Sequence, residues 1–339
     1  MNVSVIICTH NRSSFLLELL SSFKDQTVSP SEYELIVIDN ASSDNTKEVV
    51  CNASRDLRNL RYFYEPELGI SRARNTGVKN AKGDIIAFID DDALPESNWL
   101  EVLINTFQTV TPVPVGVGGK ILPQWEVPKP AWVPDNKILQ SLSLIDWGDQ
   151  PHWIPTPSLS AGNLALRKIA FNKVGEFNIS LGRIGNKMSS MEEILFLFLM
   201  LQEFGSQSLL YQPEAVVNHR IPKDRIANRR YIIRRSYWDG FSKAMMKIII
   251  SQMDFNGKLD LSSFQMVRYK KRGVLAGSAM RFARGSISGL QAIFRMDRKK
   301  LTECLIHMAF GLGGMIGLAK HFFFNSNAGV SEKLFKPLK

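Results

Sequence analysis

Short apolar runs alternate with stretches of helical periodicity over residues 1–120. Five β-branched runs predict strands: Val3–Cys8, Glu34–Ile38, Leu60–Tyr64, Asp84–Ile89 and Val115–Ile121. We expect helices to begin in the gaps, near Ser13, Asp44, Ser71 and Pro95, with Ser13 and Asp44 as N-caps and Pro95 at a first helical position. This alternation predicts an α/β fold whose mostly parallel sheet is flanked by helices, as in nucleotide-binding half-domains.

The pattern changes after residue 120. Residues 123–157 are rich in Pro and hold four of the six tryptophans, Trp125, Trp132, Trp147 and Trp153. We expect an ordered loop region over the sheet edge, whose tryptophans either stack on the apolar faces of ligand rings or pack in the core. Beyond it the pattern predicts a strand at Leu159–Leu166, a short helix at Arg167–Val174 and an apolar helix at Ser189–Phe204. A strand pair follows, at Ser208–Tyr211 and Ala215–Asn218.

The last third of the chain reads as helical and basic. We expect a basic amphipathic helix at Asp224–Met246 and an apolar helix at Leu301–Phe324. The apolar run is long enough to raise the question of a membrane span, but Glu303, His307 and Lys320 interrupt it. It is therefore expected either to lie on a membrane surface or to pack as a helical lid on the catalytic domain.

Together these patterns divide the chain into an α/β domain over 1–222, with halves over 1–120 and 121–222, and a helical C-terminal region over 223–339.

Charge is distributed unevenly along the chain. Residues 1–219 hold 18 Lys and Arg against 25 Asp and Glu, whereas residues 220–339 hold 24 against 7. A basic region of this length predicts an anionic partner: a lipid surface, a phosphate-bearing substrate or nucleic acid. Arg229, Arg230, Arg234 and Arg235 form a basic helical face that either grips phosphates or is simply solvated.

The three cysteines are far apart and lack disulfide or zinc spacing, which favours a reducing cytoplasm. The first strand begins at Val3 with no basic segment or cleavage site before it, so we expect no secretory signal.

Three adjacent carboxylates, Asp90, Asp91 and Asp92, follow the apolar strand Ile85–Ile89. They stand at the carboxyl edge of the predicted sheet, where open α/β sheets bind ligands. Asp90 and Asp92 are two apart and can approach one hard cation, with Mn²⁺ or Mg²⁺ expected. An acidic triplet can also be a solvated helix-capping turn, but its position after a buried strand favours a binding site.

A further carboxylate, Asp39, ends the neighbouring strand and is followed by Asn40-Ala-Ser-Ser-Asp44. It is placed either to hydrogen-bond a nucleobase or ribose or to cap a turn.

Four motifs in order resemble those of the family 2 glycosyltransferases, of the type that builds bacterial surface polysaccharides. They are Val3 to Arg12 with its Thr9-His-Asn11-Arg12, Asp39 to Asp44, Ser71-Arg-Ala-Arg74-Asn-Thr-Gly77, and Phe88-Ile-Asp90-Asp91-Asp92. Cys8 and His10 replace the Pro and Tyr common in the first motif. The resemblance implies the GT-A fold, a nucleotide-diphospho-sugar transferase fold. It also implies a nucleotide-sugar site at Thr9, Asn11, Asp39, Arg74, Asp90 and Asp91, with Asp92 at the metal bound to the donor diphosphate.

The resemblance continues into residues 121–222. It implies that 1–222 is a catalytic domain in which residues 1–120 bind the nucleotide sugar and residues 121–222 bind the acceptor. Gly162 and Asn163 match the family's acceptor-side strand, to which we add Trp153 as a candidate stacking surface. Glu192 and Glu193 match an acidic pair that supplies the family's catalytic base, and alignment of the motif favours Glu193 as that base. A structural role is the alternative, because carboxylates at a helix start are also stabilised by the helix dipole. His219 matches a histidine that approaches the metal or diphosphate; a structural role is its alternative.

These features predict an inverting glycosyltransferase that moves a sugar from a nucleotide diphosphate donor, UDP-sugar favoured, to a saccharide or lipid-linked acceptor. The expected cofactor is Mn²⁺ or Mg²⁺, and the expected location is the cytoplasmic face of the cell membrane, peripherally bound to an anionic surface. No nucleic-acid partner is expected. A sugar nucleotidyltransferase is one alternative, disfavoured because no Gly-rich phosphate loop follows the first strand. The other is a non-catalytic membrane- or nucleic-acid-binding protein.

Overall fold

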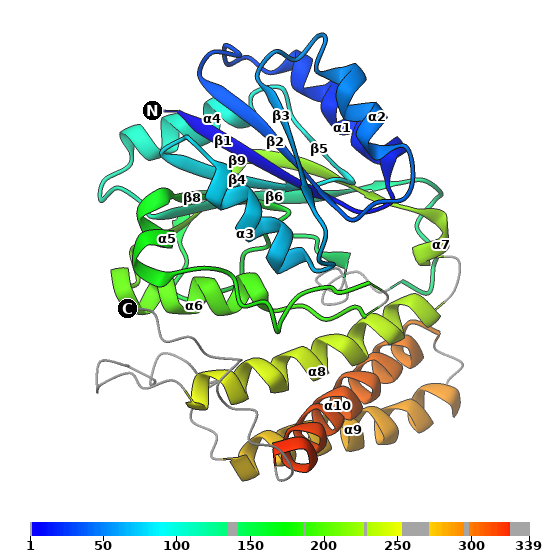
Figure 1. Ribbon diagram of the computed structural model, residues 1–339. Helices are drawn as coiled ribbons and strands as arrows, with labels where there is room; N and C mark the ends of the chain where they lie inside the picture. Colours follow the sequence, from blue (N-terminus) through cyan, green and yellow to red (C-terminus); the bar gives the residue numbers. More distant parts are fainter. Residues whose placement is uncertain are drawn as a thin grey trace. The chain divides into compact units, whose positions relative to one another are not determined.

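A computed structural model describes residues 2–133, 142–185, 187–226, 229–252, 271–294 and 298–325 (Figure 1). The chain forms two compact units built from interleaved segments. The first comprises Met1–Gln124, Ser143–Ile179 and Glu192–Arg220, and the second Trp125–Leu142, Ser180–Met191 and Ile221–Lys339.

Four parallel strands make one half of the sheet in the first unit. In spatial order they are β3 (Leu60–Glu65), β2 (Tyr33–Asn40), β1 (Val3–Thr9) and β4 (Ile85–Asp90). All four confirm predicted strands. The side chains of β1, β2 and β4 are buried on both faces, whereas the edge strand β3 buries only Leu60. The register sets Thr9 opposite Asp39 and Cys8 opposite Asp90. The polar residues that end these strands therefore share one edge of the sheet.

The other half of the sheet is antiparallel where it meets β4, so the sheet is mixed where a mostly parallel one was predicted. The order continues through β8 (Asn163–Arg167), β6 (Gly116–Trp125), β9 (Leu209–Ile221) and β5 (Ala93–Pro95), and β7 (His152–Trp153) also pairs with β9. The strand pair predicted after residue 207 is the single strand β9. Pro213 lies inside it without ending it, since a proline removes only one backbone donor.

Helices cover both faces of this sheet. Figure 1 shows α1 (Ser13–Ser22), α2 (Thr46–Ala53) and α4 (Trp99–Thr109) on one side, and α3 (Ile70–Asn80), α5 (Lys168–Val174) and α6 (Glu192–Phe204) on the other. A short 3₁₀ helix, η1 (Phe23–Asp25), follows α1. Aromatic rings in edge-on and tilted contact pack in the core beside α5 and α6, from Phe88, Phe171, Phe177 and Phe196.

Three predicted helix starts need correction. The N-cap positions of α1 and α2 are Arg12 and Asn45, and neither helix has a side-chain cap. Asp44 instead accepts hydrogen bonds from the Ser13 and Thr46 amides and so ties the two helix starts together. Pro95 ends β5, because Ala93–Pro95 pairs with β9, and α4 begins four residues later at Trp99.

The second unit contains α7 (Lys223–Ile226), α8 (Arg230–Gln252), α9 (Lys271–Phe294) and α10 (Arg298–Asn325). The single helix predicted over 224–246 is divided between α7 and α8, and residues 227–228 lie outside the described ones. The helix predicted over 301–324 is confirmed as α10. Its glycines allow close packing, since a Cβ at Gly313 would overlap the Tyr237 carbonyl of α8 and one at Gly311 would lie 2.5 Å from the Ser278 carbonyl of α9.

One described helix is long and apolar enough to cross a membrane. The window is Thr302–Ala319 in α10, with a mean hydropathy of 1.3, and 44% of it is buried within the protein. The same pattern is typical of a helix in the core of a soluble bundle.

Candidate active site

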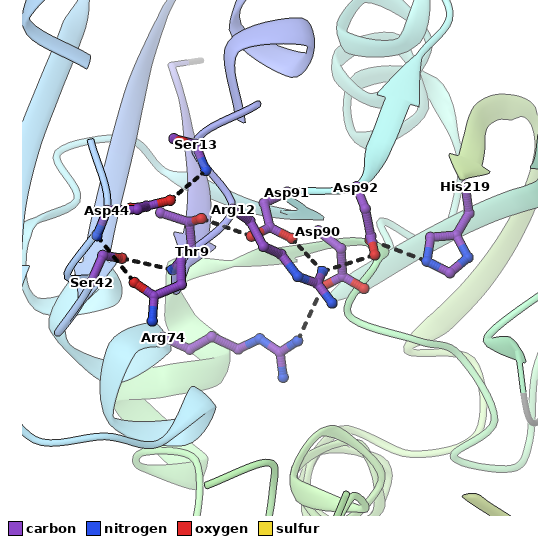
Figure 2. A network of polar contacts seen from close by, with 11 residues as sticks. Thr9, Arg12, Ser13, Ser42, Asp44, Arg74, Asp90, Asp91, Asp92 and His219 are labelled. Carbon is purple, nitrogen blue, oxygen red and sulfur yellow. Dashed lines mark hydrogen bonds and ion pairs between the residues drawn. The ribbon is translucent and has the colours of Figure 1, made fainter. Parts of the chain in front are cut away.

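The acidic triplet is the centre of a polar network at the edge of the sheet (Figure 2). Asp90 ends β4, and Asp91 and Asp92 form the turn to β5. The guanidinium of Arg12 donates from Nη1 to Asp91 Oδ1 and Asp92 Oδ2, at 2.9 Å in both cases. Asp91 is the main cause that raises the pKa of Arg12 above its ordinary value, so this cation stays charged. The positive charge that the triplet requires is thus supplied by a side chain of the chain itself.

Asp91 is held by a second donor. The Thr9 hydroxyl donates to Asp91 Oδ2 at 2.7 Å, and both side chains are buried. Burial raises the pKa of Asp91, while Arg12 acts in the opposite direction. Thr9 and Asp91 therefore satisfy each other, and a contact of either with the nucleotide sugar stays a prediction.

Asp92 and His219 form the deepest pair of the network. His219 Nε2 lies 3.1 Å from Asp92 Oδ1, and both side chains are buried. The pairing of β5 with β9 brings them together, because Ala93 stands opposite His219. His219 Nδ1 is buried and has no hydrogen-bond partner among the described residues. The pair predicted from sequence as metal ligands is therefore assembled by the fold.

A divalent cation fits this pair as part of its coordination. Two octahedral ligands at about 2.1 Å from Mg²⁺ or Mn²⁺ stand about 3 Å apart, which matches the pair. In the part of the chain that the structure describes, no group of three or more His, Cys, Asp or Glu side chains is arranged to hold a metal ion. Oxygens of a bound diphosphate or of water would complete the coordination.

Arg74 connects the triplet to helix α6. From α3 its Nη2 lies 3.6 Å from Asp90 Oδ1, and its Nη1 donates to Glu192 Oε1 at 2.6 Å. Burial acts to lower the pKa of Arg74, but Glu192 and then Asp90 hold it above its ordinary value. Glu192 and Glu193 are the first two residues of α6, so this ion pair fixes the start of that helix beside the triplet. Glu192 is committed to Arg74, whereas the role of Glu193 as the base stays a prediction.

Replacing Arg74 with Met should lower the free energy of unfolding by about 3–5 kcal/mol, because it leaves the Glu192 carboxylate buried without its cation. The double variant Arg74→Met with Glu192→Gln should recover a large part of that loss. Urea denaturation of the wild type and the single and double variants measures both quantities. A double variant no more stable than Arg74→Met would contradict the pairing.

Asp39 and Asn11 organise the loop after β2. Asp39 accepts hydrogen bonds from the Ser42 amide at 2.9 Å and the Tyr62 hydroxyl at 2.8 Å. Asn11 adopts a φ of 52°, which asparagine tolerates, and its Oδ1 accepts from the Ser43 amide at 2.7 Å. Both shape the rim of the network, and their contacts with a nucleotide stay predictions.

The three candidate acceptor residues occupy different surroundings. A Cβ on Gly162 would lie 3.0 Å from Asp90 Oδ2, so this glycine adjoins the triplet. Asn163 is 1% exposed. Its amide nitrogen donates to the carbonyls of Lys120 and Ala215, and its amide oxygen accepts from the Trp99 indole. Trp153 pairs with Leu210 and lies outside the network of Figure 2. Asn163 is therefore built to hold strands together, and acceptor binding by all three stays a prediction.

Two residues of the site area were not assigned from sequence. Arg12 is the last residue of the first motif, and its position just after the end of the strand predicted at Val3–Cys8 was the available signal. Cys8 lies beside the network, and burial raises its pKa to about 12, which keeps it a neutral thiol. Of the tryptophans, Trp147 contacts Tyr211 with ring centroids 5.2 Å apart but is partly exposed, so both core packing and acceptor stacking stay predictions.

Comparison with known proteins decides the family. The family model described as glycosyl transferase family 2 matches residues 4–163, which include the whole acidic triplet and all four motifs except Val3. Residues 4–163 are therefore a glycosyl transferase family 2 domain. The alternatives of a nucleotidyltransferase and a non-catalytic binding protein are thereby disfavoured.

Relatives of this family 2 glycosyltransferase carry names from saccharide synthesis. Glucosyl-dolichyl phosphate glucuronosyltransferase of Haloferax volcanii is 26% identical over 273 residues, which are 79% of this chain and 84% of that protein. Succinoglycan biosynthesis protein ExoM of Rhizobium meliloti is 25% identical over 243 residues, 71% of this chain and 73% of that protein.

Two solved structures confirm the GT-A fold. The mannosyltransferase PcManGT of Pyrobaculum calidifontis, in complex with GDP-Man and Mn²⁺, matches with a TM-score of 0.57 and 18% identity, over 92% of this chain and 86% of that one. TarS 1–349 of S. aureus, in complex with UDP-GlcNAc, matches with a TM-score of 0.55 and 16% identity, over 90% of each chain.

Proposed function

We propose that this enzyme transfers a sugar with inversion from a nucleotide diphosphate donor, UDP-sugar favoured, to a saccharide or lipid-linked acceptor in surface polysaccharide synthesis. The observation that carries the proposal is the position of Arg74. One buried guanidinium contacts Asp90 at the end of β4 and Glu192 at the start of α6. The expected donor edge and the start of the helix that carries the expected base, Glu193, are therefore held by the same guanidinium.

The donor and acceptor classes draw support from the relatives. Solved structures of the same fold hold GDP-Man with Mn²⁺ and UDP-GlcNAc. The archaeal relative is named for a glucosyl-dolichyl phosphate acceptor, and the bacterial one for succinoglycan synthesis. A lipid-linked acceptor would place the enzyme at the cytoplasmic face of the membrane, in keeping with the basic residues of 220–339.

In the proposed reaction, the Glu193 carboxylate takes the proton of the acceptor hydroxyl. The acceptor oxygen bonds to the anomeric carbon as the bond from that carbon to the phosphate oxygen breaks on the opposite face. The electron pair leaves with the nucleoside diphosphate, and Arg12 stands beside the acidic edge to balance charge there. A divalent cation bound by Asp92 and His219 would supply Lewis-acid stabilisation of the leaving diphosphate. Glu192 holds Arg74 and so orients the helix that carries Glu193.

A panel of nucleotide sugars tests this function. Binding to the folded state raises the melting temperature, so the cognate donor should stabilise the enzyme, and more strongly with Mn²⁺ than without it. Differential scanning fluorimetry with UDP-, GDP- and dTDP-sugars measures the shift. If no nucleotide sugar stabilises the enzyme in the presence of Mn²⁺ or Mg²⁺, the proposal fails.

A further inference from the structure

Helix α9 presents an apolar face that the described residues leave exposed. Met280 is 53% exposed and Ile287 is 63% exposed. They are seven residues apart, which is two helical turns, so they lie on the same side of the helix. Ala279 and Ala283 on this side are exposed as well. Isolated exposed apolar residues are common, but a stripe of them along one helix indicates a surface that meets a partner.

Positive charge lies along the same helix. Arg281 and Arg284 are both exposed and neighbour the apolar residues in sequence. The guanidinium of Arg281 lies 4.7 Å from the ring centroid of Phe310 in α10, and Lys243 Nζ of α8 lies 6.0 Å from the same centroid. Cations from α8 and α9 thus converge on one aromatic ring.

These cations also act on one another. Burial, and then the charges of Arg281 and Lys247, lower the pKa of Lys243 to about 8. The sequences of α8, α9 and α10 contain only two acidic residues, Asp239 and Glu303. Asp239 accepts a hydrogen bond from Ser190 at 3.1 Å and lies 3.3 Å from Arg235. Asp239, the acidic residue of α8, is therefore paired with other groups. A bound anion would reduce the repulsion between Lys243 and Arg281 beside the Phe310 ring.

We propose that the helical unit docks on an anionic phospholipid surface through α9, with Met280 and Ile287 entering the interface and Arg281 and Arg284 beside the lipid phosphates. A helix with apolar residues on one face and flanking arginines binds in this way, and the arginine stems can lie along the acyl boundary while their charges reach the headgroups. The apolar window of α10 is a weaker candidate, because its glycines pack closely against α8 and α9. This inference deepens the lipid-linked acceptor part of the proposed function and rests on it.

Sedimentation of the full chain with lipid vesicles tests the docking. The wild type should bind phosphatidylcholine vesicles that contain phosphatidylglycerol, and should bind vesicles of phosphatidylcholine alone at least about tenfold more weakly. Added salt should weaken the first interaction. The variants Arg281→Gln/Arg284→Gln and Met280→Ser/Ile287→Ser should each bind the anionic vesicles about tenfold more weakly than the wild type.

Matched controls come from the first unit. Lys79→Gln/Lys82→Gln removes two positive charges from exposed positions, as the arginine variant does. Ile169→Ser/Ile179→Ser removes two apolar side chains that are 39% and 45% exposed. Both should bind vesicles like the wild type. Equal loss in a control and its matched α9 variant, or no binding of the wild type to anionic vesicles, would overturn the docking.

The donor panel keeps the two proposals apart. Absent vesicle binding together with stabilisation by a nucleotide sugar refutes the docking alone. Vesicle binding without stabilisation by any nucleotide sugar refutes the proposed function and leaves the lipid surface standing.

Discussion

The Asp92→Asn variant should turn over the nucleotide-sugar donor more slowly by a factor on the order of 10² or more, even at saturating Mn²⁺. Asparagine keeps the shape of the side chain but removes the charge that faces His219 at 3.1 Å and Arg12 at 2.9 Å. The proposed cation would lose its only carboxylate ligand, and the leaving diphosphate would lose the charge stabilisation that the cation supplies.

Release of nucleoside diphosphate, followed over a range of Mn²⁺ concentrations, measures this loss. Asp56→Asn is a matched control, since Asp56 is a 64% exposed side chain paired with Lys24 at 2.6 Å, remote in sequence from the triplet. It should retain wild-type turnover. A near wild-type rate for Asp92→Asn would remove Asp92 from the metal site.

The Glu193→Gln variant should lower kcat by a factor on the order of 10² or more and leave the donor dissociation constant largely unchanged. The amide cannot accept the proton of the acceptor hydroxyl, but it keeps the size of the side chain. Glu193 follows Glu192 at the start of α6, and Glu192 is the member whose oxygen takes the short hydrogen bond from Arg74.

Steady-state kinetics with donor affinity from calorimetry separates the two effects. Glu203→Gln, an exposed position on the same helix, should behave like the wild type. Weaker donor binding in Glu193→Gln with an unchanged kcat would indicate a structural role at the helix start. A larger loss of kcat in a folded Glu192→Gln variant than in Glu193→Gln would move the base to Glu192.

The parallel half of the sheet was predictable because each of its strands is marked by a pattern of consecutive residues in the sequence. Each of β1 to β4 is a short apolar run that ends in a polar residue, and the right-handed crossover rule then puts those polar residues at one edge. The sequence therefore predicted that Asp39 and Asp90 lie at one edge of the sheet. The prediction that their strands are neighbours was wrong, because β1 lies between β2 and β4. The apolar strand before Asp90 was a sufficient signal for a ligand site.

The contacts that complete the site were not predictable from local pattern. Arg12 and Asp92 are 80 positions apart, and Arg74 and Glu192 are 118 apart. Strand β5 has only three residues, which is too short for a recognisable alternation of apolar and polar positions. Its pairing with β9 brings His219 to Asp92. Long-range pairing also explains why Pro95 belongs to a strand although its residue type favours a helix start.

The most direct test of the account is the anomeric configuration of the product, followed by ¹H NMR during transfer from the donor that the stabilisation panel identifies. The proposed single displacement, with Glu193 as base and the diphosphate leaving from the opposite face, predicts that the first product formed has the opposite anomeric configuration to the donor. A first product with the configuration of the donor would contradict the account.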